Sequence, residues 1–394
     1  MRGVRGFGDG FVALLLPVYL LHLGFSALAI GSIITSTLLG SALLTLGVGM
    51  SAHRHSRRRL LAGACLLMAA TGAALAIGQG YCWILLVAFL GTVNPTAGDV
   101  SVFLPLEHTV LAQSVEPSRR TASFARYGVV GAVMGSLGTL AASIPDLATA
   151  RAGASPTLAV QGMFWLYGAL GLVALALCRS LSPAIESPLG SDASRSALRE
   201  SAATVYRLAA LFSIDALGSG FFVQSLLALW LVQAFHLSVA TASAIFFWTG
   251  LCSALSQLIA VPVAERIGLI PTMVFTHLPS NLCLILLPFA PRLSIAIGLL
   301  LLRSALSQMD VPARASYVMA VVPPAERPAA ASVTALPRSL ATASSPILAG
   351  YLLSVSAFGW PLIAGGALKS IYDLLLWANF RKLRPQEEPA RQAP

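Results

Sequence analysis

The chain has 394 residues, of which 57% are hydrophobic and only 10% are charged, and its formal net charge is +10. An average soluble domain is about 45–50% apolar and about 25% charged, so this composition excludes an ordinary soluble fold. A membrane-spanning helix takes about 20 apolar residues, and the length therefore accommodates twelve of them with loops, a linker and tails. Runs such as 60–77 lack the alternation that a transmembrane barrel requires, which leaves helices.

Hydropathy and helix-breaking residues predict an all-α polytopic membrane protein with twelve transmembrane helices in two pseudo-symmetric six-helix bundles. The helices expected in the first bundle, residues 1–180, are 9–24, 28–49, 60–76, 81–112, 121–143 and 158–178. Those expected in the second bundle, residues 204–382, are 208–235, 239–264, 269–289, 293–321, 328–355 and 361–380. The fourth, seventh, tenth and eleventh segments exceed the bilayer thickness, so we expect tilts or kinks in them.

Two further segments have the composition of solvated chain. Ser, Pro, Gly and charged residues predict a cytoplasmic linker at 181–203, and the sequence Pro-Gln-Glu-Glu-Pro predicts a disordered cytoplasmic tail at 383–394.

The distribution of Lys and Arg predicts the orientation, because segments on the cytoplasmic side carry the excess of positive charge. With both termini inside, 18 of the 25 basic residues lie on the cytoplasmic side, two lie outside and five lie within the helices. We therefore expect a multi-pass protein of the cytoplasmic (inner) membrane with both termini in the cytoplasm. The same distribution explains the basic charge without a nucleic-acid partner. All five cysteines lie in apolar runs without CxxC spacing, so neither a metal site nor a cofactor is expected.

The two halves of the chain repeat a loop motif. Residues 47–59, GVGMSAHRHSRRR, follow the second expected helix, and residues 260–268, AVPVAERIG, follow the eighth. In layout and in these loops the chain resembles the major facilitator superfamily, whose loop has the form G-x-L-A-D-R-x-G-R-R, with His53 here in place of its Asp. The resemblance implies a cytoplasmic charge relay that latches the two halves, and so a gating role for Arg54, Arg57, Arg58, Glu265 and Arg266. An alternative role for the arginines is ordinary membrane anchoring.

Glycines recur along the fifth expected helix. Gly131 and Gly135 have the GxxxG spacing that permits close packing of two helices. Proton-driven exporters of the family carry a glycine-rich motif with a proline on this helix, and this chain has no proline there. Helix packing is therefore the preferred interpretation of these glycines.

Ionisable residues inside a membrane are costly and mark functional sites by default. The family resemblance implies that helices one, four, seven and ten line a central cavity, and the acids on those helices here include Asp9, Asp99, Glu107, Asp215 and Asp310. Asp99 and Asp215 have no base nearby in the sequence, and Pro95 predicts a kink near Asp99. We therefore expect these two acids to couple transport to protons or to contact the substrate, and the alternative is a structural hydrogen-bonding role.

Depth along the helices predicts partners for the other charges. Glu107 and Arg126 lie at similar depths and are expected to form an ion pair. Asp310, with Arg314 one turn away and Pro312 between them, is expected at the centre of a network in the cavity. Arg303 and Arg338 are the other expected members of this network, and Lys369 is expected to neutralise Asp373 on the last helix.

Six uncharged polar or aromatic residues within the helices are further candidates for the cavity: Tyr19, Gln224, Trp230, Gln257, His277 and Asn281. Tyr and Trp near helix ends are commonly interfacial anchors, which is the alternative for Tyr19 and Trp230. His277 and Asn281 lie one turn apart, but a metal site would need further ligands.

These observations predict a secondary active transporter that moves a small molecule by alternating access. Nothing resembles a G-x-x-x-x-G-K-[ST] nucleotide-binding loop, so an ion gradient must drive uphill transport. Proton-coupled export is the first hypothesis, and uptake of a small organic anion by proton symport is the alternative. A membrane enzyme or a non-transporting receptor is disfavoured, and the expected partners are protons, substrate and lipid, with a monomeric chain.

Overall fold

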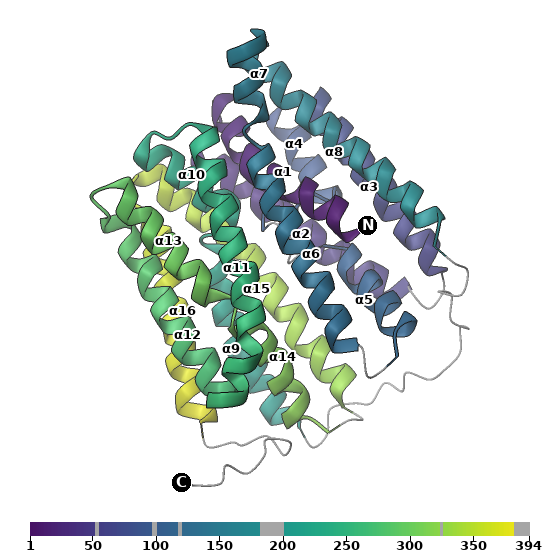
Figure 1. Cartoon of the computed structure of the whole chain (residues 1–394), viewed down its shortest axis with the longest axis vertical. Coiled ribbons are helices and arrows are strands. Elements are labelled where there is room, and N and C mark those ends of the chain that lie inside the picture. Colours follow the sequence, from purple (N-terminus) through teal and green to yellow (C-terminus); the bar gives the residue numbers. More distant parts are fainter. Residues whose placement is uncertain (52–54, 97–100, 117–119, 182–200, 324–325, 382–394) are drawn as a thin grey trace. The chain divides into compact units, whose positions relative to one another are not determined.

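The computed structural model describes residues 1–51, 55–96, 101–116, 120–181, 201–323 and 326–381. Within these ranges every regular element is a helix, as the sequence predicts (Figure 1). The structure divides into two compact units. Unit 1 is drawn from Met1–Gly190, Gly220–Leu251 and Ala343–Pro361, and unit 2 from Ser191–Ser219, Cys252–Thr342 and Leu362–Pro394. Most of the predicted linker and tail lies outside the described residues, and the two-bundle boundaries stay predictions.

The helices of the first half follow the predicted segments, with one addition. They are α1 (Arg2–His22), α2 (Ala27–Ser51), α3 (Arg57–Ile77), α4 (Tyr81–Leu90), α5 (Phe103–Ser114), α6 (Arg120–Ala141), α7 (Ile144–Ala152) and α8 (Pro156–Arg179). The addition is α7, which begins with Pro145 in its first turn and ends at Gly153 in the left-handed conformation that favours glycine.

The helices of the second half also follow the predicted segments. They are α9 (Ala202–Gly220), α10 (Gln224–Phe235), α11 (Val239–Ile267), α12 (Leu269–Leu286) with the 3₁₀ turn η3 (Leu287–Phe289), α13 (Leu293–Ser307), α14 (Asp310–Val321), α15 (Arg327–Val355) and α16 (Trp360–Phe380).

Three of the four overlong segments are broken in the structure. The fourth ends its first helix at Leu90 and resumes at Phe103, and its described residues between them include Pro95. The seventh is interrupted at residues 221–223 and the tenth at residues 308–309. Pro312 lies in the first turn of α14, where its missing N–H costs no helical hydrogen bond, so the expected kink is a break just before it.

Nine helical segments among the described residues are long and apolar enough to cross a membrane. They include Ala202–Phe235, which spans the break between α9 and α10, but not α15 or α16. In α16 the polar side chains of Lys369 and Asp373 lower the mean hydropathy, and both residues are buried within the protein. Hydropathy alone thus undervalues the helices that carry buried charge.

In unit 1, α1 packs closely against α6, and α3 packs against α8. A Cβ atom on Gly10 would overlap the carbonyl oxygen of Gly135, and one on Gly6 would lie 2.9 Å from that of Gly131. The absence of side chains at Gly6 and Gly10 therefore lets α1 approach the backbone of α6, and the packing role of the GxxxG pair on α6 itself stays a prediction.

In unit 2, an apolar core surrounds the helices that carry charge. Phe212 of α9, Met273 of α12, Tyr317 of α14 and Tyr372 of α16 are buried members of this core. A Cβ atom on Gly218 would lie 2.7 Å from Cγ of Lys369 and 2.9 Å from the carbonyl oxygen of Gly365. The absence of a side chain at residue 218 therefore lets α16 approach α9 at the level of the lysine.

Candidate functional site

Unit 2 contains a buried group of six ionisable side chains, which we call the unit 2 charge cluster. Its members are Asp215, His277, Asp310, Arg314, Lys369 and Asp373, and each side chain is at most 9% exposed. They come from α9, α12, α14 and α16. Charged groups are rarely buried unless they are paired, so this concentration in one unit defines the candidate site.

Asp215 lies at the centre of the unit 2 charge cluster. Nζ of Lys369 donates a hydrogen bond to Oδ1 of Asp215 at 2.5 Å, and Nη1 of Arg314 donates one to Oδ2 at 3.1 Å. Lys369 also donates to Oγ of Ser219, one turn beyond Asp215, at 2.8 Å. Each oxygen of one carboxylate thus binds a different cation.

Asp310 binds the other side of Arg314. Nη2 of Arg314 donates to Oδ2 of Asp310, one turn earlier on α14. Asp310 is the first residue of α14, where the unsatisfied N–H groups of the helix favour a carboxylate. The break before α14 therefore supplies a favourable position for one of the three acids in the cluster.

The remaining acid, Asp373, is bound by α12. Nδ1 of His277 lies 2.9 Å from Oδ1 and 3.1 Å from Oδ2 of Asp373, and Nδ2 of Asn281 donates to Oδ2 at 2.8 Å. Nε2 of His277 points to the other carboxylate and lies 3.9 Å from Oδ1 of Asp215. His277 thus stands between the two acids.

Each of the four helices contributes two polar residues one turn apart, which places both on the same face. The pairs are Asp215 and Ser219, His277 and Asn281, Asp310 and Arg314, and Lys369 and Asp373. The i,i+4 spacing is visible in the sequence, but only the packing of the four helices brings the pairs together.

Among themselves, the six members of the cluster do not balance in charge, and Arg338 of α15 also acts electrostatically on Asp215. Three carboxylates face two permanent cations, Arg314 and Lys369, and the sixth member is a histidine. With His277 neutral the cluster has one excess negative charge, and with His277 protonated it is neutral. Histidine is the side chain that most readily changes charge near neutral pH.

Two sequence predictions need correction here. Asp215, which has no base nearby in the sequence, has two cations within hydrogen-bonding distance because α14 and α16 pack against α9. Lys369 was expected to neutralise Asp373 and does act on it electrostatically, but Asp373 forms hydrogen bonds with His277 and Asn281 on α12. Sequence reasoning missed the contacts between helices because it compared residues only along each helix or by depth.

Unit 1 contains a smaller buried ion pair. Nη2 of Arg5 lies 3.0 Å from Oε2 of Glu107, whose other hydrogen bond comes from the hydroxyl of Tyr127. The guanidinium of Arg5 also lies over the ring of Phe103, 4.1 Å from its centroid. The expected pairing of Glu107 with Arg126 is wrong, because the side chain of Arg126 is exposed while Arg5, at the start of α1, reaches the acid.

Two other residues of the predicted network lie on neighbouring helices of unit 2. Arg303 is half-buried on α13, and Arg338 is exposed on α15 and acts electrostatically on Asp215. Arg54 and Asp99 lie outside the described residues, so the roles assigned to them stay predictions.

The residues expected to gate the cytoplasmic side lie at helix ends. Arg57 and Arg58 begin α3, and Nη2 of Arg58 donates to the carbonyl oxygen of Arg179 at 3.0 Å. Glu265 and Arg266 are exposed in the last turn of α11. The contact of Arg58 with the end of α8 is an anchoring contact within unit 1, and the gating role stays a prediction.

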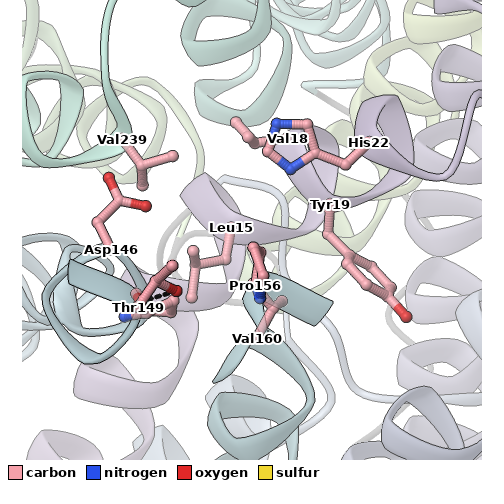
Figure 2. A pocket seen from close by; sticks show the side chains of 10 residues that line it. Leu15, Val18, Tyr19, His22, Asp146, Thr149, Pro156, Val160 and Val239 are labelled. Carbon is pink, nitrogen blue, oxygen red and sulfur yellow. Dashed lines mark hydrogen bonds between the residues drawn. The ribbon is translucent and has the colours of Figure 1, made fainter. Parts of the chain in front are cut away.

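A small hollow of about 40 Å³ lies in unit 1 between α1, α7, α8 and the first residue of α11. Figure 2 shows the carboxylate of Asp146 turned toward Val239, with His22 and Tyr19 on α1. Oδ2 of Asp146 accepts a hydrogen bond from the backbone N–H of Ala240 at 3.3 Å. Pockets for small ligands occupy about 300–1,000 Å³, so this hollow is too small for one, and Asp146 serves to cap α11.

Comparisons with known proteins agree with this architecture. Residues 208–394 match the family model described as Major Facilitator Superfamily. The chain is 23% identical over 404 residues to an uncharacterized membrane protein of Saccharomyces cerevisiae, YJR124C, across 94% of this chain and 90% of that protein.

Solved structures show the same fold at low sequence identity. The nucleoside transporter NupG superposes with a TM-score of 0.71 at 14% identity, covering 96% of each chain. A D-xylose-proton symporter gives a TM-score of 0.70 at 17% identity, covering 95% of each chain. The human organic anion transporter MFSD10 gives 0.62 at 18% identity, covering 95% of this chain and 98% of that one.

These findings confirm the resemblance that the loop motifs predict. The chain is a multi-pass helical membrane protein with the fold of the major facilitator superfamily, and its second half matches the model of that family. The family match and the fold together indicate a transporter rather than an enzyme.

Proposed function

We propose that the chain is a proton-coupled secondary transporter that moves a small molecule by alternating access of two helical bundles. The observation that carries the proposal is the burial of the unit 2 charge cluster, in which three carboxylates, two cations and one histidine contact one another. Buried ionisable groups in membrane proteins mark ion and substrate pathways, and this cluster can accept one proton without leaving an unbalanced cation. Asp99 and Arg303 remain proposed contributors to the substrate cavity.

The direction of transport has two candidates. Proton-driven export is the first, because a carboxylate that exchanges a proton for a substrate suits an antiporter. Uptake of a small organic anion with a proton is the second, and the buried cations Arg314 and Lys369 favour it. One structural neighbour is described as a proton symporter and another as an organic anion transporter. This fold can therefore support proton coupling and can carry organic anions.

Substrate-induced pH change in proteoliposomes tests the proposal. Purified protein is reconstituted with an internal pH-sensitive dye, and a panel of small organic anions and uncharged metabolites is added outside. We expect at least one compound to move protons, and Asp215→Asn to abolish that movement while Glu116→Gln, an exposed acid, retains it. The sign of the pH change relative to the compound assigns symport or antiport. Transport without proton movement in the wild-type protein would refute the coupling.

We also propose the cytoplasmic membrane as the location, with both termini in the cytoplasm. The bias of 18 basic residues on one side against two on the other supports this orientation. Reporter fusions at the two ends of the chain test it, since both should be active only for a cytoplasmic reporter. The monomeric state stays a prediction, which the mass of the purified protein in detergent tests.

A further inference from the structure

Lys369 and His277 both point to one oxygen atom of Asp215. Oδ1 of Asp215 accepts a hydrogen bond from Nζ of Lys369 at 2.5 Å, and Nε2 of His277 lies 3.9 Å from that oxygen. The second distance is too long for a hydrogen bond. Lys369 therefore holds the oxygen in this structure, and His277 stands next to it.

The other side of the imidazole explains why Nε2 makes no bond. An ionised Asp373 can only accept, so we assign the ring proton to Nδ1 of His277 from the 2.9 Å contact, which is shorter than the 3.4 Å between Nδ1 and Nδ2 of Asn281. Asn281 donates to the same carboxylate and fixes its orientation. A neutral His277 then presents a lone pair at Nε2 to Asp215, and a lone pair facing a carboxylate explains the 3.9 Å gap.

We propose that a proton bound at Nε2 of His277 transfers Oδ1 of Asp215 from Lys369 to His277, and that the freed Lys369 binds the anionic group of the substrate. The proton makes Nε2 a donor, so an Nε2–H···Oδ1 bond forms as the Nζ–H···Oδ1 bond breaks. Lys369 keeps its hydrogen bond to Ser219, which holds the ammonium in place. This inference rests on the proposed function and assigns proton–anion symport to it.

Charge balance explains why the proton and the anion would travel together. A proton and a monovalent anion that bind together leave the net charge of the cluster unchanged. An anion alone would add negative charge to a buried site while Oδ1 of Asp215 still holds Lys369, which is costly. The proton and the anion therefore favour each other's binding, and this coupling is reciprocal.

Charged groups lie on each helix that contacts α12 near His277. They are Asp215 of α9, Arg303 of α13, Asp310 and Arg314 of α14, and Lys369 and Asp373 of α16, while Arg338 of α15 acts electrostatically on Asp215. Of these, Asp215 and Asp373 lie nearest the imidazole, on its two opposite nitrogens. In the doubly protonated ring, Nδ1–H donates to Asp373 and Nε2–H donates to Asp215 once Oδ1 has moved within hydrogen-bonding distance.

The chain has two lysines, Lys369 and Lys382, which makes a lysine-specific measurement selective. The full-length Lys382→Arg protein is labelled with ¹³C-lysine in detergent, so that Lys369 gives the single lysine Cε–Hε resonance. The spectrum is recorded from about pH 8 to about pH 5, on both sides of the value near 6.5 at which an ordinary histidine titrates. Formate, a small carboxylate that stays ionised over this range, is the probe anion.

We expect the Lys369 resonance to shift in one proton-linked step, and formate to shift it further only on the acidic side. For one linked proton, the affinity for formate rises up to about tenfold for each pH unit until the histidine is fully protonated. His277→Gln should abolish both shifts, whereas His236→Asn, which replaces an exposed histidine in the left-handed conformation, should keep them. The wild-type titration needs no substitution in the cluster and tests the proposal even if His277→Gln does not fold.

The proposal is overturned if the Lys369 resonance does not respond to pH, or if formate binds equally well at both ends of the range. It is also overturned if His277→Gln folds and responds as the wild-type protein does. If protons move in proteoliposomes but the Lys369 resonance does not respond to pH, the transport proposal stands and the proposed exchange of partners at Asp215 is refuted. A responsive Lys369 without proton movement would support the partner exchange and refute the proposed coupling of transport.

Discussion

Replacement of Lys369 by Met should destabilise the protein strongly, because it removes one of two permanent cations from the unit 2 charge cluster. Nζ of Lys369 lies 2.5 Å from Oδ1 of Asp215, and the two side chains are 8% and 2% exposed. At this separation and an effective dielectric constant of about 20, the attraction is about 6–7 kcal/mol before the cost of desolvation. Breaking a buried pair from one side typically costs about 3–5 kcal/mol, which is the expected loss in the free energy of unfolding.

A second substitution tests whether charge is the cause. The double variant Lys369→Met with Asp215→Asn removes one cation and one acid, so the cluster again has a single excess negative charge. We therefore expect the double variant to recover about 2 kcal/mol relative to Lys369→Met alone, which is a coupling of the size found for contacting residues. If the two substitutions acted independently, the double variant would lose the sum of the two single losses in the free energy of unfolding.

The free energy of unfolding is measured by titration with sodium dodecyl sulfate in mixed micelles. Arg292→Met is the matched control, because Arg292 is an exposed cation of the same unit, and its effect should stay within about 0.5 kcal/mol. A Lys369→Met protein as stable as this control, or a double variant that loses the sum of both single effects, would refute the reasoning.

The other predictions concern unit 1 and use the same unfolding titration. Gly10→Ala should lower the free energy of unfolding by about 1–3 kcal/mol, because its methyl group would overlap a backbone oxygen of α6. The control Gly63→Ala, whose methyl group meets nothing within 4 Å, should be neutral or stabilising, and equal effects would contradict the packing argument. Arg5→Gln should lower the free energy of unfolding by about 3 kcal/mol, because it leaves the buried acid Glu107 without its cation. Arg126→Gln should change it by less than about 0.5 kcal/mol, and the reverse order of the two effects would support the pairing of Glu107 with Arg126. Asp146→Ala should cost about 1 kcal/mol through the lost cap of α11, and Asp146→Asn, which keeps an accepting oxygen, should cost less.

Hydropathy located the helices because the bilayer imposes a simple requirement on each of them separately. All twelve predicted segments contain helix, and most of their ends agree to within a few residues where the structure describes them. The exceptions are α1 and α9, which begin at Arg2 and Ala202 and not at residues 9 and 208. Proline residues indicated two of the breaks, since α4 ends at Leu90 before Pro95 and the break at 308–309 precedes Pro312. The break at 221–223 was not located, although the excess length of its segment indicated that a continuous helix was unfavourable there. The exact position of a break depends on which neighbouring groups satisfy the freed backbone, and no local pattern contains that information.

The sequence by itself determined the class of protein, because composition and apolar run length decide whether a chain can exist in a bilayer. It also identified most of the buried charges, since an ionisable residue in an apolar run is visible without any structure. Only the tertiary structure decided the partners of these charges. Lys369 lies four residues from Asp373 in sequence but binds Asp215, and Glu107 binds Arg5, about a hundred residues away. Helical spacing fixes which residues share a face, whereas the partner across a face is set by the packing of helices that are distant in sequence.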